Sequence, residues 1–532
     1  HVLVREVAYG QIPRAERAGK HRRAAGWLES LAAGPNPPAG RDPAGRSELL
    51  AHHYGQALAL ASAAGQDTGD LAERARLALK DAGDRVTTLG THVTAARYYA
   101  AALDLWPDAD PLRPELEFRT GEARCLGEGT GEDLLARARD GLLAAGAHER
   151  AAEAEVRLGQ LAYAHGRQRT AHLDRALALI ADQPASRSKA AVLSGYGMHQ
   201  MLADRHAEAL RVAREALTMA RAFGASEVEE EALGTIGAAR ASLGDEGGIA
   251  DLERCIALCE EHGSSSAVPW HLNLADVLAT LGDLRRCFTA RAAARRVAER
   301  FGSARWLRWL ELERAAEYYW SGRWDEAVAI ADAVVAEAAD GIPHMLEGEC
   351  RTWRGRILLA RGQVTGALED SDRALELARE SGDHQDLGPA LGLAAQAQLA
   401  AGHLAEAGKL VDELLGNLGG RLLKADLGVD LAIVLAELER PIEVLDEVLP
   451  SRWLEAARAF AAGDPGRAAA IYAEIGSRPD EANARLAAAR RLHADDRVAE
   501  GRTELERALA FFREAGATAH LEEAKELLFA RT

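Results

Sequence analysis

The stretch Ala275-Asp-Val-Leu-Ala-Thr-Leu-Gly282-Asp-Leu-Arg-Arg-Cys287-Phe-Thr-Ala-Arg-Ala-Ala-Ala294 decides the fold, because its pattern returns at a near-constant interval along most of the chain. The turn residue Gly282 follows a small residue by seven positions and precedes two others by five and by twelve. Side chains this small allow two helices to approach closely, and a Gly or Asp between them supplies a tight turn. The corresponding turn residues are Gly90, Gly166, Asp204, Gly244, Gly282, Gly322, Gly362, Gly402, Gly463 and Asp496.

The spacing of these turn residues is nearly constant. From Gly166 to Gly402 the differences between successive residue numbers are 38, 40, 38, 40, 40 and 40. The step from Gly90 to Gly166 is 76, twice 38, which predicts a degenerate unit around 127–131. A fixed period with one helical hairpin in each unit is typical of an α-solenoid. The sequence therefore predicts an all-α repeat protein.

The turn and small-residue positions resemble the pattern of the tetratricopeptide repeat (TPR). Close matches are Gly244-Asp245, Gly282-Asp283 and Gly322-Arg-Trp-Asp-Glu-Ala327. The period exceeds the TPR norm of about 34 residues, and in this it resembles the arrays of bacterial STAND-type regulators (signal-transduction ATPases with numerous domains). The resemblance implies a right-handed superhelical α-solenoid of TPR-like helical hairpins with a period of about 40 residues.

The amino end of the chain also resembles these regulators. Residues 1–23 are similar to the segment that closes the helical module after their NTPase domain, and Ala51-His-His-Tyr54 is similar to the start of their array. In actinobacterial members this layout commonly follows a P-loop ATPase and a class III adenylate/guanylate cyclase domain. The resemblance implies an upstream NTPase domain as a partner. Because the chain begins at His1 and not at Met, it was either processed or is a fragment of a longer protein, and we expect a fragment.

Composition and repeat register together suggest five segments. We expect 1–33 to be the end of an upstream helical or winged-helix module, 34–46 a Pro/Gly-rich linker, and 47–420 the TPR-like repeat array. An irregular helical insertion, with a helix over about 422–438, is expected at 421–450. Terminal TPR-like repeats and a capping helix are expected over 451–532.

The charge of the chain limits its partners. There are 64 basic and 82 acidic residues, a net charge of −18, which makes nucleic acid or an anionic membrane an improbable partner. Residues 1–46 are the exception, with a net charge of +4 from eight basic and four acidic side chains. These basic residues fit a solvated face packed against an upstream domain better than a phosphate or DNA contact.

The location follows from cysteine use and hydropathy. Five scattered cysteines are too few for a disulfide framework, and no signal peptide is visible. The longest charge-free run, Leu387 to Ala405, lies in the repeat register and contains Pro389, which indicates a buried helix and no membrane span. We therefore predict a cytoplasmic protein.

No pattern in the sequence indicates catalysis or a cofactor. No G-x-x-x-x-G-K-[ST] or G-x-S-x-G motif occurs, so we predict no nucleotide cradle and no nucleophile. A thiolate metal site at Cys255 and Cys259 is conceivable, but these thiols fit a buried core better. The pair His52-His53 lacks an H-E-x-x-H context, and packing or hydrogen bonding explains it better than metal ligation. The sequence thus predicts no catalytic residue, no cofactor and no metal.

One aromatic cluster stands out as a binding site for a partner. Trp306, Trp309, Trp320 and Trp324 fall within nineteen residues, beside Tyr318 and Tyr319. In TPR proteins such positions on the first helix of the hairpin line the concave groove, where rigid rings can anchor a peptide. The alternative is that the rings fill gaps between hairpins, and the sequence does not decide between the two. The predicted groove residues are Trp309, Leu312, Tyr319, Trp320, Arg356 and Asp276.

Three functions fit these expectations. The first is a non-catalytic scaffold that binds a protein or peptide, or senses a ligand, and regulates an upstream signalling ATPase or nucleotide cyclase. The second is the activation arm of a STAND-type transcriptional regulator, which requires a DNA-binding domain outside this chain. The third is a free-standing TPR adaptor that holds two partners together. In all three the array supplies binding energy and no chemistry.

Overall fold

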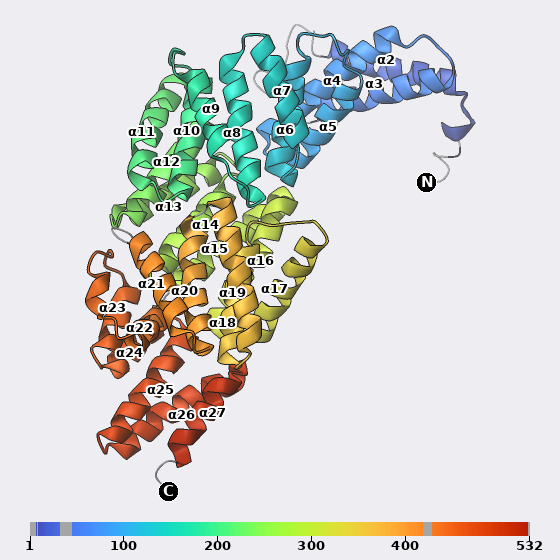
Figure 1. Cartoon of the computed structure of the whole chain (residues 1–532). Coiled ribbons are helices and arrows are strands. Elements are labelled where there is room, and N and C mark those ends of the chain that lie inside the picture. Colours follow the sequence, from blue (N-terminus) through green and yellow to red (C-terminus); the bar gives the residue numbers. More distant parts are fainter. Residues whose placement is uncertain (1–6, 8, 32–44, 383, 419–427, 530–532) are drawn as a thin grey trace. The chain divides into compact units, whose positions relative to one another are not determined.

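The structure, a computed structural model, describes residues 7, 9–31, 45–382, 384–418 and 428–529. Its regular elements in these ranges are helices (Figure 1). Two compact units divide the chain: residues 1–161 with 301–303, and residues 162–300 with 304–532.

The first unit consists of successive antiparallel helices. Pro13, which has no N–H to donate and a fixed φ, stands at the N-cap of its α2 helix and starts it. The helices are α2 (Arg14–Ser30), α3 (Arg46–Ala63), α4 (Gly69–Thr88), α5 (His92–Asp104), α6 (Arg113–Glu128), α7 (Glu132–Ala144) and α8 (His148–Ala164), the last of which spans the boundary between the units.

The second unit continues the same alternation. Its first ten helices are α9 (Thr170–Ile180), α10 (Arg187–Leu202), α11 (His206–Phe223), α12 (Ser226–Ser242), α13 (Gly247–Glu261), α14 (Ala267–Leu281), α15 (Leu284–Phe301), α16 (Ala304–Ser321), α17 (Trp324–Ala339) and α18 (Glu347–Ala360). They are followed by α19 (Val364–Ser381), α20 (His384–Ala400), α21 (Leu404–Leu418), α22 (Gly428–Glu437), the 3-10 helix η2 (Ile442–Leu445), α23 (Arg452–Ala461), α24 (Pro465–Ile475), α25 (Arg478–Ala494), α26 (Val498–Ala515) and α27 (Thr518–Phe529).

The turn residues behave as the repeat pattern predicts. All ten have positive φ, from 57° at Asp204 to 90° at Gly282, in the left-handed region that Gly and Asp tolerate best. Gly129 and Gly131, also with positive φ, separate α6 from α7 and confirm the degenerate unit at 127–131. The all-α solenoid of TPR-like hairpins with a period of about 40 residues is therefore confirmed.

The small residues seven positions before each turn allow the two helices of a hairpin to touch. A Cβ added at Gly237 on α12 would lie 2.8 Å from the backbone nitrogen of Leu252 on α13. A Cβ at Gly83 on α4 would lie 2.5 Å from the Tyr99 ring on α5. Both distances are shorter than van der Waals contact, so a side chain at Gly237 would meet fixed backbone and one at Gly83 would require the Tyr99 ring to move.

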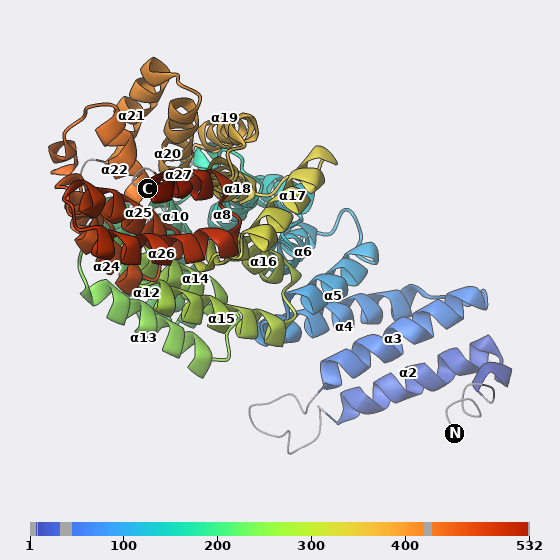
Figure 2. The same cartoon turned by 90° about the horizontal axis from the view of Figure 1, so that it is seen from below.

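Within the second unit, the C-terminal helices pack on the turn ends of earlier hairpins (Figure 2). The contacts join α23 to α14, α25 to α16 and α27 to α18. The Trp453 indole donates to the Ala279 carbonyl at 2.8 Å, Arg478 to that of Ser321 at 2.7 Å, and Thr518 to that of Arg361 at 2.9 Å. The final helix, expected as a cap on the last hairpin, thus also packs on an earlier repeat.

The structure describes only parts of the five expected segments. Helix α2 lies in the segment 1–33, and the linker 34–46 falls outside the described residues except for Gly45 and Arg46. In the expected insertion at 421–450, α22 and η2 are short helices, and 419–427 lie outside the described residues. The bounds of the five segments stay predictions.

Candidate functional site

Charged and aromatic side chains gather on α14, α16 and α18, the first helices of three successive hairpins. We call this set the A-helix polar cluster. Part of it follows from spacing along single helices. Trp309 and Glu313 are one helical turn apart on α16, and Glu349 and Trp353 are one turn apart on α18, so each pair shares a helix face. Because equivalent positions of these two hairpins differ by 40 in number, Glu349 takes the position of Trp309 and Trp353 that of Glu313. The members are Asp276, Arg291, Trp309, Glu313, Glu349 and Trp353.

Hydrogen bonds fix the two tryptophan–glutamate pairs. The Trp309 indole Nε1 donates to Glu313 Oε1 at 2.9 Å, and the Trp353 Nε1 donates to Glu349 Oε1 at 3.1 Å. Each indole therefore keeps its polar edge satisfied while its rings pack against neighbouring aromatics. The carboxylates are held in one orientation as a result.

Arg291, from α15, contacts two of the three first helices, α14 and α16. Its Nε lies 2.7 Å from Glu313 Oε2, its Nη1 donates to the Glu313 carbonyl at 3.3 Å, and its Nη2 lies 3.6 Å from Asp276 Oδ1. Arg291 and Glu313 are both buried, whereas the Asp276 side chain is 53% exposed. Burial disfavours the charge on Arg291, but the attraction of Glu313 and its acidic neighbours outweighs this cost and raises the pKa of the guanidinium.

Glu349 is the carboxyl whose ionisation the cluster perturbs most. Burial raises its pKa to about 7, and the negative charge of Glu313 adds to the effect. The hydrogen bond from Trp353 and the charge of Arg291 oppose this shift. Arg291 thus pairs with Glu313 and lies near Asp276, whereas burial and the negative charge of Glu313 favour the protonated form of Glu349 near neutral pH.

The cluster is suited to binding a cation. It brings together three carboxyl groups, one of them with a raised pKa, and perturbed ionisable groups of this kind concentrate at functional sites. Asp276 and, in part, Glu349 and Trp309 are accessible to solvent, and a tryptophan face adds attraction for an ammonium or guanidinium group.

The structure places the six residues predicted for the groove in two environments. Asp276 and Trp309 belong to the A-helix polar cluster, and the Trp309 ring also lies 5.6 Å from the His344 ring between their centroids. The others, Leu312, Tyr319, Trp320 and Arg356, are buried. That a partner binds any of the six stays a prediction.

The buried aromatics form a packed series between hairpins, as in the packing alternative. Trp320 meets the Trp353 ring edge-on at 4.9 Å, and Tyr319 stacks on Trp324 at 5.9 Å between centroids. Trp324 in turn contacts Phe511 of α26, and the Arg356 guanidinium lies 5.5 Å from the Trp353 centroid. These rings lock α16, α17, α18 and α26 together.

Sequence reasoning missed three charged members of the cluster, Arg291, Glu313 and Glu349. Arg291 lies on a second helix of a hairpin, where no groove residue was expected. Glu313 and Glu349 were passed over among 82 acidic residues, although their spacing of four from a tryptophan was a visible signal. Trp and Glu change places between equivalent positions of these two successive repeats. This pattern in the sequence could have identified Glu313 and Glu349.

The cysteines considered for a metal are buried free thiols. The Cys255 Sγ donates to the Glu230 carbonyl at 3.1 Å, and His262 Nδ1 lies 2.7 Å from the Glu230 carboxylate. Burial raises the pKa of Cys287 to about 12, so this thiol stays protonated at neutral pH. Among the residues described, no helix is long and apolar enough to cross a membrane.

Comparisons with known proteins give no family for the chain. No family model matches it, and the search of curated proteins found no match. Among solved structures, a Rap protein complexed with Competence and Sporulation Factor is similar over 75% of this chain and 99% of its own, with 14% identity and a TM-score of 0.39. The apo quorum sensor NprR from B. thuringiensis is similar over 67% of this chain and 97% of its own, with 12% identity and a TM-score of 0.37.

A third solved structure is aspartyl phosphate phosphatase F from Bacillus subtilis. It is similar over 75% of this chain and 94% of its own, with 12% identity and a TM-score of 0.30. Scores this low carry no argument about this chain, so its function has to be argued from its own residues.

Proposed function

We propose that this chain is a non-catalytic TPR-like scaffold that binds a basic protein or peptide segment and thereby regulates an upstream signalling ATPase or nucleotide cyclase in the cytoplasm. The upstream domain is part of the proposal because the amino end of the chain resembles STAND-type regulators. The observation that carries the binding role is the A-helix polar cluster, in which acidic groups exceed their basic partner.

The exposed edge of the cluster defines the chemistry of the partner. Asp276 presents a half-exposed carboxylate beside Arg291, and Glu349 holds a proton that a bound cation would displace. A lysine or arginine side chain placed between these carboxyls would restore the charge balance and pack its stem on Trp309. The proposed partner is therefore an arginine- or lysine-bearing segment.

Binding at this position can change the arrangement of other helices in the second unit. The hairpins that carry the cluster are the ones whose turn ends contact α23, α25 and α27. A ligand that favours one arrangement of α14, α16 and α18 therefore also biases the C-terminal hairpins. In the intact protein, such a shift would alter the balance between closed and open states of the upstream NTPase.

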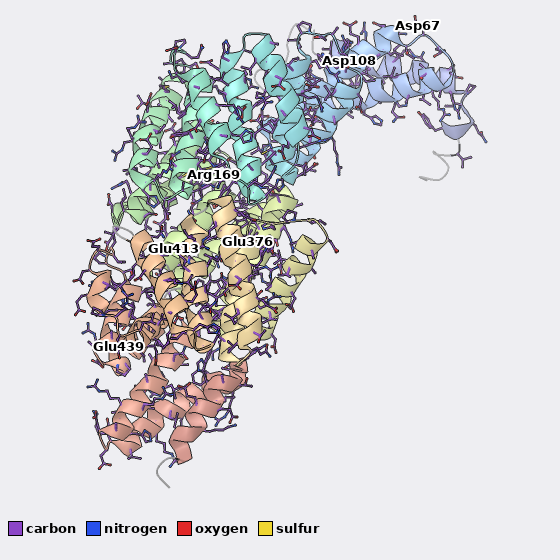
Figure 3. All side chains as sticks on the ribbon, in the orientation of Figure 1. Asp67, Asp108, Arg169, Glu376, Glu413 and Glu439 are labelled. Carbon is purple, nitrogen blue, oxygen red and sulfur yellow. The ribbon has the colours of Figure 1, made fainter. Side chains whose placement is uncertain are left out.

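A titration with matched variants tests the proposal. A fluorescent arginine-rich peptide is titrated with the wild-type chain, with Asp276→Asn and with Glu376→Gln, whose carboxylate lies on α19 outside the cluster (Figure 3). We expect Asp276→Asn to weaken binding about ten-fold, since one charge pair in a partly buried site contributes on the order of 1.4 kcal/mol. Glu376→Gln should bind as the wild type does, and equal affinity of all three chains would contradict the proposal.

A further inference from the structure

Three histidines of the first unit converge in space. His21 lies on α2, and His52 and His53 are neighbours on α3. A ring nitrogen from each lies within 4.8 Å of a ring nitrogen of the other two. His21 Nδ1 and His53 Nδ1 are 2.9 Å apart, and the three pairs of ring centroids are separated by 5.2 to 5.9 Å.

Core packing does not account for this cluster. His52 is exposed and the other two histidines are only partly buried, so the rings do not fill the apolar core of the unit. That core is formed by other residues of α2 and α3 and by two residues of α4: Ala18, Ala25, Tyr54, Ala57, Ala61, Leu71 and Ala75. Instead, the three imidazoles bring their ring nitrogens together near the surface, and a hydrogen bond joins His21 Nδ1 to His53 Nδ1.

The state of the rings suits metal binding. Burial lowers the pKa of His21, and the neighbouring His53 and His52 lower it further. Burial and His52 lower the pKa of His53 in the same way. A metal ion requires neutral imidazole, and burial favours that form at His21 and His53.

A second contact orients His21. The Tyr9 hydroxyl lies 2.6 Å from His21 Nε2, so a metal on Nδ1 would leave the other ring nitrogen bonded to the phenol. Outer contacts of this kind fix the ring orientation of histidine ligands. The positive charge of Arg17 opposes cation binding. Arg17 lies 5.0 Å from the Tyr9 ring centroid, and its charge lowers the pKa of His21.

We propose that His21, His52 and His53 form a binding site for a divalent transition-metal ion, with Zn²⁺ the ion that this donor set fits best. Imidazole nitrogen is a preferred zinc ligand, and three histidines leave a fourth position for water or an external ligand. Two nitrogens on one tetrahedral zinc are about 3.3 Å apart. The two Nδ1 atoms are 2.9 Å apart and share a hydrogen bond, so an ion would replace the shared proton and move the rings apart by about 0.4 Å.

The ion would fasten α2 to α3. Alanine side chains make up most of the core between these helices, and small side chains bury little apolar area. A metal that bridges His21 to the histidine pair adds a link between two helices separated by 32–44 in the sequence. The site lies in a different unit from the A-helix polar cluster and does not depend on it.

The test uses the full chain without an affinity tag. Zn²⁺ alone is titrated calorimetrically, and Co²⁺ serves as a spectroscopic replacement whose visible absorption reports tetrahedral nitrogen ligation. The variants are His52→Ala, which changes an exposed side chain and should not disturb folding, and His53→Ala. The control is His148→Ala, an exposed histidine at the start of α8.

We expect the wild type and His148→Ala to bind one Zn²⁺ per chain, and His52→Ala and His53→Ala to bind at least ten-fold more weakly. Zn²⁺ should also slow amide hydrogen exchange in α2 of the wild type and leave it unchanged in His52→Ala. Absence of Zn²⁺ binding by the wild type, or binding that both cluster variants retain at full affinity, would overturn the proposal.

Discussion

Glu349 is the residue whose proton the fold controls most directly. Its pKa is about 7 in the folded chain, against an ordinary value of 4.5. Between these two values the folded chain holds a proton that the unfolded chain has released, so the free energy of unfolding falls as pH rises through this window. The residue therefore reduces the free energy of unfolding at neutral pH.

Replacing this carboxyl tests the cause of the shift. We expect Glu349→Gln to be more stable than the wild type at pH 8 by on the order of 1–3 kcal/mol, and to have no such advantage at pH 4.5. Urea unfolding at the two pH values measures the difference. The exposed Glu376→Gln is the control and should show no such pH dependence, whereas an identical profile for Glu349→Gln would contradict the raised pKa.

Arg291 and Glu313 are a buried ion pair in which each residue depends on the other. Arg291→Leu should reduce the free energy of unfolding by about 3–5 kcal/mol, because it leaves the Glu313 carboxylate buried without its guanidinium. The double variant Arg291→Leu with Glu313→Leu should recover a large part of this loss. Denaturant unfolding of the two single variants and the double variant gives the coupling energy, and strict additivity would rule out the pair as the source.

At the scale of the helix, α12 and α13 approach closely because Gly237 has no side chain. Gly237→Ala should destabilise the chain by about 1–3 kcal/mol, because the new Cβ meets the backbone nitrogen of Leu252 at 2.8 Å and this backbone cannot rotate away. Gly416→Ala on α21 is the matched control, since its Cβ has no atom within 4 Å. That control should be stabilising by about 0.5–1 kcal/mol.

Thermal unfolding followed by circular dichroism measures both glycine variants. A loss of stability at Gly416→Ala equal to that at Gly237→Ala would mean that helix propensity, and not the distance between helices, explains the result.

The local features of the fold are the ones that the sequence predicts. A positive φ at Gly282 or Asp204 depends on the residue itself, and the small positions beside it depend on the facing helix of the same hairpin. Contacts between segments that are distant in the sequence produce no comparable pattern of residue types. The bond from Trp453 to Ala279 joins residues 174 positions apart, and neither residue differs in type from many others in the array.

The candidate sites show the same limit. Trp309 and Asp276 were predicted because their repeat positions line the concave groove in TPR proteins, whereas Arg291 lies on a helix to which the pattern assigns no such role. His52 and His53 were visible as a pair, but the third ring comes from His21, on a separate helix. These groups are brought together by packing between helices, which cannot be predicted from the spacing of residues along the chain.

At the scale of the whole second unit, the C-terminal hairpins stabilise the middle of the array. Trp453 is fully buried, and its indole fixes α23 on the end of α14. Trp453→Ala should destabilise the unit by about 3–5 kcal/mol, through the cavity it leaves and the unpaired Ala279 carbonyl. Hydrogen exchange should then quicken at the end of α14 as well as in α23. Faster exchange in α23 alone would contradict this long-range support.

The central claim is that a basic segment binds on α14, α16 and α18, and hydrogen–deuterium exchange with a saturating arginine-rich peptide tests it most directly. The account predicts slower exchange in these three helices for the wild type and for Glu376→Gln, and a smaller effect for Asp276→Asn at the same peptide concentration. Protection confined to other helices, or protection that Asp276→Asn leaves unchanged, would contradict it.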